Sequence, residues 1–298
     1  MKRFFLSFCL LLITVSHVLL AKDDVAICAI FQNEAPYLVE WIEFHKLQGV
    51  KHFYLYNNNS EDNYLEVLQP YIDQNLVTLN DWLFTYEYSD HTRWIAIQTG
   101  AYKDCIKNYG DQMEWLAAID VDEFLYTVKG KKLGDFLKAY RQFGGLGVNW
   151  VKFGTNNVED FTPGKLLIQE LTRCGRYRET QNQFMKAIAQ PKYVADCTSP
   201  HCFRYIPGKF AVNADKQKVS GPRSDVIHLR DIRINHYWTR TKKYLFEEKI
   251  PSRQKRRDAW TTERILQMCD ELNAQEDKTI LQYVAPLRKQ MGLPAMAQ

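Results

Sequence analysis

Three carboxylates stand within four positions directly after an apolar run. The run 115–119 is followed by Asp120, Asp122 and Glu123, and an uncharged segment of this length is typical of a strand buried on both faces. If the chain stays extended, the side chains of Asp120 and Asp122 point to the same side, about 6–7 Å apart. Such charges repel each other unless a cation lies between them, and Mg²⁺ or Mn²⁺ takes one or two carboxylates together with substrate phosphates. The spacing predicts a divalent-metal site that holds a diphosphate.

The position of the acids in the chain distinguishes the predicted metal site from other acidic motifs. Ligands of open α/β sheets bind outside the carboxyl ends of strands, although a D-x-D triplet alone also occurs as solvated turn carboxylates. A calcium loop of EF-hand type needs Gly at its sixth position and Glu at its twelfth, where Leu125 and Lys131 stand. A phosphatase with an aspartyl nucleophile carries its acids on the first strand, whereas here they follow roughly the fourth.

Strand and helix patterns alternate before the acids. Pro36 suits the first position of a helix, and His45 lies on the apolar face of that helix, which favours a packed core histidine over a ligand. This alternation is the βαβ pattern of a parallel sheet and predicts an α/β fold. The predicted strands are 25–31, 53–56, 76–79 and 115–119, and the predicted helices are 36–49, 65–71 and 91–109.

The second half is less periodic. We expect a helix over 133–143, a strand over 147–154, and short strands at 227–229 and 234–238. From residue 241 the chain is basic and then amphipathic, which is typical of a solvated helix face, although such a run can also rest on anionic lipid.

Composition points to a globular, exported chain. The 298 residues are 46% hydrophobic, and the formal charge of +4 falls to +2 without Lys2 and Arg3, so nucleic acid is disfavoured as a partner. Residues 1–21 have a positive start and an apolar stretch, which predicts a signal peptide or an N-terminal membrane anchor. Six cysteines follow this leader, an even number that permits disulfides without defining their pairing.

In this order and at these intervals, the motifs resemble glycosyltransferase family 92, formerly a domain of unknown function, and its family-2-like relatives. The resemblance covers roughly residues 25–250. It implies a GT-A fold, with a mixed, mostly parallel sheet flanked by helices, and transfer of a hexose, commonly galactose from a UDP-sugar, with inversion and help from Mn²⁺ or Mg²⁺. The motifs that carry it are Asn33-Glu34, the helix from Glu40-Trp41 through His45 to Gly49, Asn57 to Asp62, the block from Asp120 to Phe124, Lys186 to Pro191, His201, and Asn235-His236-Tyr237.

This resemblance suggests roles for individual residues. Asp122 is the expected metal ligand, with Asp120 on the metal or the ribose, and His236 is either a third ligand or, like Lys186, a phosphate contact. Asn33, Glu34 and Asp62 would contact uracil and ribose, and Gln98 and His201 are further candidates for the nucleotide site. Inversion needs a general base on the acceptor side. For that base we consider two carboxylates, Glu170 and Asp196.

The predicted helices, strands and motifs also suggest a division into domains and two alternative functions. We expect one glycosyltransferase domain over 22–240, with a nucleotide-binding half (22–130) and an acceptor half (131–240), and a basic helical extension over 241–298. The partners would be a nucleotide sugar and a glycan, the location membrane-anchored or secreted, and the oligomeric state is open. The main alternative is a noncatalytic secreted carbohydrate-binding protein on the same fold, and a metal phosphoesterase is a third possibility.

Overall fold

The computed structural model describes residues 23–85, 91–256 and 261–295. The predicted leader over residues 1–21 lies outside the described residues. None of the helices within the described ranges is both long enough and apolar enough to cross a membrane.

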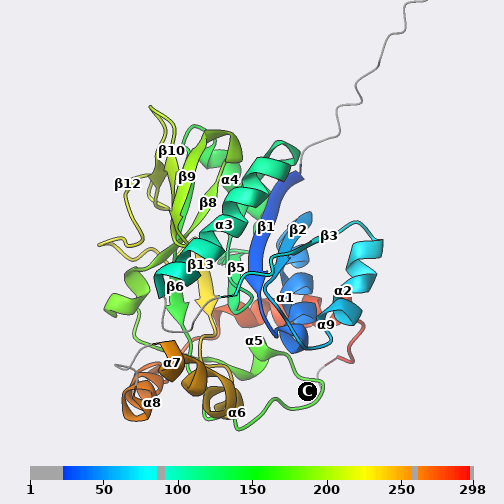
Figure 1. Cartoon of the computed structure of the whole chain (residues 1–298). Coiled ribbons are helices and arrows are strands. Elements are labelled where there is room, and N and C mark those ends of the chain that lie inside the picture. Colours follow the sequence, from blue (N-terminus) through cyan, green and yellow to red (C-terminus); the bar gives the residue numbers. More distant parts are fainter. Residues whose placement is uncertain (1–22, 86–90, 257–260, 296–298) are drawn as a thin grey trace, which may run out of the picture.

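The first half is a parallel sheet whose central strand, β1 (Asp23–Phe31), is buried on both faces. Because side chains alternate along a strand, the set that begins at Val25 packs with α1 (Ala35–Leu47) and the set that begins at Ala26 packs with α3 (His91–Tyr109). Figure 1 shows α3 crossing one face of this sheet and α1 lying on the other. The predicted parallel βαβ arrangement is confirmed.

A mixed sheet continues into the second half in the order β12-β11-β6-β8-β4-β1-β2-β3, and β13 joins β5 to β6. β1, β2, β3 and β4 pair in parallel, whereas β8 runs antiparallel to β4 and β6. The α/β fold with helices on both faces agrees with the expectation. The remaining bounds are β2 His52–Asn57, β3 Val77–Asp81, β4 Met113–Ala118, β5 Glu123–Thr127, β6 Gly145–Lys152, β8 Met185–Ala189, β11 Ala211–Val212, β12 Lys218–Val219 and β13 Ile232–His236.

Smaller elements complete the body of the fold. The two-stranded pairs are β9 with β10 and β7 with β14. The bounds of these four strands and of the remaining helices in this part of the chain are α2 Tyr64–Asp73, η1 Gly110–Gln112, α4 Leu133–Leu137, η2 Lys138–Tyr140, α5 Leu167–Glu170, β7 Arg173–Cys174, η3 Thr180–Gln183, η4 Pro191–Tyr193, β9 Val194–Ser199, β10 Cys202–Tyr205 and β14 Gln275–Glu276.

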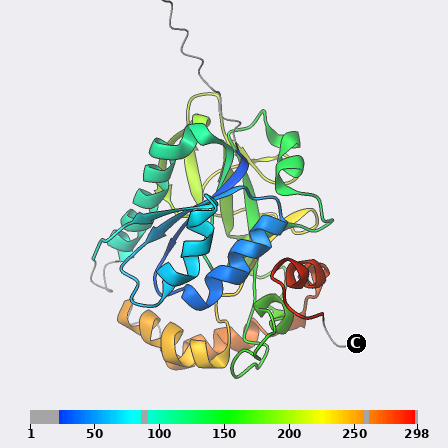
Figure 2. The same cartoon turned by 90° about the vertical axis from the view of Figure 1, so that its right-hand side faces the viewer.

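In the view of Figure 1 the helices α6, α7 and α8 lie below the sheet. α7 (Ile250–Arg256) and α8 (Thr262–Glu271) form a small apolar cluster with Trp238. The last helix, α9 (Val284–Gln290), lies beside α1, as Figure 2 shows, and Gln290 donates a hydrogen bond to Glu43. The other segments of this region are α6 Lys242–Tyr244, η5 Leu245–Lys249 and η6 Thr279–Tyr283.

Two local predictions are wrong. Residues 227–229 form no strand, because this segment is a loop held by His228, whose ring lies 3.0 Å from Asp215 and whose backbone N–H donates to Asn149. The chain also does not stay extended through the acids: β4 ends at Ala118, and a turn closed by the N–H of Glu123 on the carbonyl of Asp120 leads into β5. The two aspartates therefore belong to a tight turn and not to a strand.

Candidate functional site

A cavity of about 370 Å³ lies where the carboxyl ends of β4, β6 and β13 meet the start of β8. Strands that end at one edge of a sheet place their following residues close together. For this reason residues far apart in sequence line a single pocket. Its walls are Trp94, Ile95, Gln98, Asp120, Asp122, Trp150, Lys152, Phe184, Lys186, Thr198, Ser199, Pro200, His201, Pro222, His236, Trp238, Lys249 and Arg253.

Asp120 is fixed by two donors from different elements. Lys186 Nζ donates to its Oδ2 at 2.9 Å, and Gln98 Nε2 donates to its Oδ1 at 2.8 Å. Burial would lower the pKa of Lys186, but Asp120 and Glu123 raise it well above its usual value, so the lysine is charged. The structure thus brings Gln98, Asp120 and Lys186 together on the cavity wall.

Glu123 is the buried support of this turn. Its side chain is fully buried, its Oε2 accepts the N–H of Asp120 at 2.9 Å, and Lys186 Nζ lies 3.3 Å from the same oxygen. Burial raises the pKa of Glu123 well above its usual value in spite of Lys186. The third carboxylate of the motif therefore positions Asp120 and Lys186.

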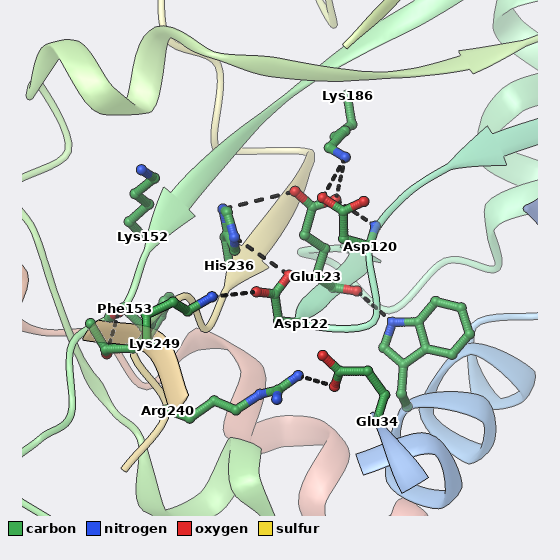
Figure 3. Close-up of polar contacts among 12 residues, drawn as sticks. Glu34, Asp120, Asp122, Glu123, Lys152, Phe153, Lys186, His236, Arg240 and Lys249 are labelled. Atoms are coloured by element: carbon green, nitrogen blue, oxygen red, sulfur yellow. Dashed lines mark hydrogen bonds and ion pairs between the residues drawn. The ribbon is translucent and has the colours of Figure 1, made fainter. Parts of the chain in front are cut away.

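Asp122 faces His236 across the turn. Asp122 Oδ1 and His236 Nε2 are 3.4 Å apart, and Lys249 Nζ approaches the other carboxylate oxygen at 3.8 Å (Figure 3). Burial alone would raise the pKa of Asp122, but His236, Lys249 and Arg240 lower it well below its usual value. Burial lowers the pKa of His236. The surrounding cations thus favour the ionised form of the Asp122 carboxylate.

This pair fits two ligands of one divalent cation. Two ligands about 2.1 Å from an octahedral ion are about 3 Å apart, close to the observed separation, and Asp122 Oδ1 is buried with no hydrogen-bond partner among the residues that the structure describes. Asp120 is held aside by Lys186, and within the described ranges no group of three His, Cys, Asp or Glu side chains could hold a metal by itself. The three predicted ligands therefore do not form a preassembled site, and a cation on Asp122 and His236 would need oxygens from a ligand.

His201 is packed into the cavity wall. Its Nδ1 lies 3.0 Å from the carbonyl of Met185, and its ring contacts Trp150 and Phe184. Burial, followed by the charge of Lys186, lowers its pKa to about 4. The structure places this predicted residue at the cavity as a neutral imidazole.

The three residues predicted to contact the nucleoside lie on the adjoining loops and do not line the cavity. Asn33 Oδ1 accepts the N–H of Glu61, and Asp62 Oδ2 accepts the N–H of Ala35 at 2.8 Å, so both hold the loops after β1 and β2. Glu34 pairs with the buried Arg240, and Figure 3 shows that pair just beyond Asp122.

The two candidate bases lie outside the cavity. Glu170 accepts hydrogen bonds from the N–H and the hydroxyl of Thr162, which anchors a loop. Asp196, which lies on β9, forms an ion pair in which its Oδ1 is 2.9 Å from Lys103 Nζ. Neither carboxylate lines the cavity, so the geometry gives neither of them access to an acceptor hydroxyl there.

Sequence reasoning missed the basic side of the cavity. Lys152 follows Trp150 by two positions at the end of β6, and a strand period of two places both on one face. Lys249 and Arg253 come from the basic tail that we expected to be solvated. The strand period could have identified Lys152 from the sequence. For Lys249 and Arg253 in the basic C-terminal segment, only the fold shows which side chains face the cavity.

Known proteins of one family share part of this sequence. A castor-bean (Ricinus communis) glycosyltransferase family 92 protein is 28% identical over 200 residues, which are 65% of this chain and 34% of that protein. A β-1,4-galactosyltransferase of Caenorhabditis elegans is 23% identical over 63% of this chain and 44% of its own length. The chain thus spans about a third of the first relative and under half of the second.

Solved structures are more distant. A Staphylococcus aureus TarS structure has a TM-score of 0.40 at 10% identity and covers 83% of this chain and 69% of its own. The sequence profile of glycosyltransferase family 92 matches residues 23–275. This chain therefore belongs to glycosyltransferase family 92.

Proposed function

We propose that the chain is a metal-dependent hexosyltransferase that moves a sugar, galactose foremost, from a UDP-sugar to a glycan with inversion. The observation that carries this proposal is Asp122 beside His236 on the wall of a cavity that also contains Lys186 and Lys249. Asp122 and His236 would hold a divalent cation, whose chemistry is to neutralise the charge that grows on a leaving diphosphate.

The remaining residues prepare the site for such a ligand. Lys186 and Gln98 fix the carboxylate of Asp120, which keeps free lone pairs that can accept a hydroxyl of the nucleotide. Lys249 lies beside Asp122, where it can approach the phosphates. Because these groups are held by packing and hydrogen bonds before the ligand arrives, little reorganisation is needed at the moment of reaction.

Two relatives support galactose and inversion. The worm relative is named a β-1,4-galactosyltransferase, and an Arabidopsis thaliana galactan β-1,4-galactosyltransferase is 27% identical over 41% of this chain and 25% of its own length. Nucleotide-activated galactose is α-linked, so a β product requires inversion. The general base is left unassigned, because Glu170 and Asp196 lie outside the cavity.

A donor screen tests the proposal. The full chain is heated with Mn²⁺ and UDP-galactose, UDP-glucose, UDP-N-acetylglucosamine, GDP-mannose or a CMP-sugar, since a ligand that binds the native state raises the melting temperature. We expect UDP-sugars to stabilise the protein only when metal is present, and UDP to be released slowly from the best donor. Glycan binding without UDP-sugar binding or turnover would contradict the proposal and favour the noncatalytic alternative.

A further inference from the structure

The register of the sheet places His236 opposite Glu123. In the antiparallel pair of β13 and β5 these two residues are direct partners, and just beyond the ladder the N–H of Tyr237 donates to the carbonyl of Asp122 at 2.8 Å. Partners in an antiparallel pair project from the same face of the sheet and can contact each other. The backbone therefore holds the imidazole of His236 beside two carboxylates, that of Asp122 and that of Glu123 (Figure 3).

Each ring nitrogen of His236 faces one of these carboxylates. Nε2 lies 3.4 Å from Asp122 Oδ1, and Nδ1 lies 3.8 Å from Glu123 Oε1. Within the described ranges, Asp122 Oδ1, Glu123 Oε1 and His236 Nδ1 are all buried without a hydrogen-bond partner. Buried polar atoms normally have partners, so three such atoms around one ring indicate that a bound group completes the arrangement.

The gap between Nδ1 and Oε1 has no room for a water molecule. A water that bridges two polar atoms separates them by about 4.5 Å, whereas a direct hydrogen bond separates them by about 2.9 Å. At 3.8 Å the two atoms are too close for a bridge, and a small rotation of the ring is enough to bring them into a direct hydrogen bond. Such contacts at functional sites are often long without a ligand and shorten when the ligand binds.

Only one oxygen of Glu123 is available to the ring. Its Oε2 accepts the N–H of Asp120 at 2.9 Å and lies 3.3 Å from Lys186 Nζ. Two donors thus hold the carboxylate from the side away from the ring, and Oε1 is left facing His236. One buried carboxylate therefore contacts both parts of the candidate site, the pair of Asp120 with Lys186 and the imidazole beside Asp122.

Metal binding places a demand on this ring. A neutral histidine that binds a metal through Nε2 carries its proton on Nδ1, and metal-bound histidines almost always donate that N–H to a carboxylate, a carbonyl or a water. For His236, the carboxylate oxygen that faces Nδ1 is Glu123 Oε1. The cross-strand partner of His236 is thus in the place where such an acceptor is needed.

Building on the proposed metal site, we propose that Glu123 is a positioning residue for the cation: its Oε1 accepts the Nδ1–H of His236 and so leaves the Nε2 lone pair free to bind the metal beside Asp122. Glu123 then selects the tautomer and the orientation of the ring. This role also gives the third carboxylate of the motif a function that its support of the turn does not supply.

The variant Glu123→Gln separates these two roles. The two donors at Oε2 would take the amide oxygen, so the amide NH₂ would face Nδ1 and favour a proton on Nε2, the nitrogen that the metal needs. We expect the Mn²⁺ concentration that gives half of the full UDP affinity, measured by calorimetry, to rise about 10- to 100-fold. An unchanged Mn²⁺ concentration in a folded variant would overturn the proposal.

Two further variants control this measurement. Glu40→Gln alters another carboxylate that accepts two backbone N–H groups, those of Leu167 and Ile168, but lies outside the cavity, and it should leave the Mn²⁺ dependence unchanged. In a His236→Ala background, adding Glu123→Gln should change the Mn²⁺ dependence less than about twofold, because the effect acts through the ring. The same 10- to 100-fold loss in both backgrounds would show that Glu123 acts only through the turn, and the proposal would be wrong.

The tautomer of His236 gives a direct test in the wild-type protein, which does not depend on the folding of a variant. With ¹⁵N-labelled histidine, UDP and Mg²⁺, NMR chemical shifts show which ring nitrogen carries the proton, and loss of a signal in His236→Ala identifies the ring. We expect the proton on Nδ1. A proton on Nε2 in this complex would overturn the proposal.

The measurements distinguish failure of this inference from failure of the proposed function. If the UDP affinity of the wild type does not depend on Mn²⁺, the proposed metal-dependent function is wrong and this inference falls with it. If the wild type shows that dependence and Glu123→Gln shows it at the same Mn²⁺ concentration, only the role of Glu123 is wrong.

Discussion

The two halves of the sheet contribute opposite charges to the cavity. The parallel half, from β1 to β4, ends in the turn that carries Asp120 and Asp122. Lys152, Lys186 and Lys249 come from the mixed half and the C-terminal helices. The site therefore contains carboxylates from one half and cations from the other, and its geometry depends on how the two halves pack against each other.

Removal of Lys186 should have the largest effect on stability. Lys186→Met leaves Glu123 and Asp120 without their shared cation, and breaking a buried pair costs about 3–5 kcal/mol of the free energy of unfolding. Urea denaturation measures this loss. Adding Glu123→Gln should recover part of it, because the buried carboxylate is then neutral. A loss below about 1 kcal/mol would mean that the halves are not joined through this lysine.

Acidification should lower the free energy of unfolding of the protein through His45, which lies on α1 in the parallel half. This fully buried ring accepts the N–H of Leu125 at Nε2, and burial lowers its pKa to about 3. The unfolded chain takes up a proton near its ordinary pKa of about 6.5 and the native protein does not, so the free energy of unfolding falls as the pH falls through that value. Between pH 7 and pH 5 the loss from His45 is about 2 kcal/mol.

Comparison of wild type with His45→Gln isolates this contribution. Glutamine can accept from Leu125 and donate to Trp41, and it does not titrate. Urea denaturation at both pH values should give a smaller acid loss for the variant. Equal losses in the two proteins would show that His45 is not the responsible group.

Arg240 should contribute a smaller, structural link between the halves. It pairs with Glu34 after β1, and its guanidinium lies 3.6 Å from the ring centre of Tyr37 and 4.5 Å from that of Tyr244. Arg240→Lys keeps the charge but loses the planar stacking, so we expect a loss of about 1–2 kcal/mol in chemical denaturation. An unchanged midpoint would show that charge alone makes the link.

The smallest effects should come from the two carboxylates that lie outside the cavity. Asp196→Asn and Glu170→Gln should each leave the rate of sugar transfer within about twofold of wild type, since neither side chain reaches the cavity. Initial rates at saturating donor measure this. A loss of transfer in either variant with an intact melting temperature would restore that residue as the general base.

The sequence predicted the parallel half far better than the mixed half. The helix from His91 to Tyr109 and the first strands have the expected places, because apolar runs buried on both faces and a helical period leave strong signals. No strand was predicted at β8, and the strand predicted at 227–229 is a loop, because a short antiparallel strand and an irregular loop depend on partners distant in sequence.

The site did not follow this division, because three predicted residues of the mixed half line the cavity and three of the parallel half, Asn33, Glu34 and Asp62, do not. Asp120, Asp122, Lys186, His201, Gln98 and His236 all line the cavity, because side chains that follow strand ends meet at one edge of a sheet. Glu170 and Asp196 were considered as the general base only because they are carboxylates in the acceptor half, and residue type alone does not show where a side chain points. Lys249 and Arg253 depend on how the C-terminal helices fold back, and no local pattern encodes that.

The binding of UDP by calorimetry with Mn²⁺ and with EDTA tests the central claim most directly. We predict that wild type and Asp135→Ala, which alters an exposed carboxylate on α4, bind UDP at least about tenfold more tightly with Mn²⁺, whereas Asp122→Ala loses this dependence on metal. Equal UDP affinity in all three proteins, with or without Mn²⁺, would contradict the account.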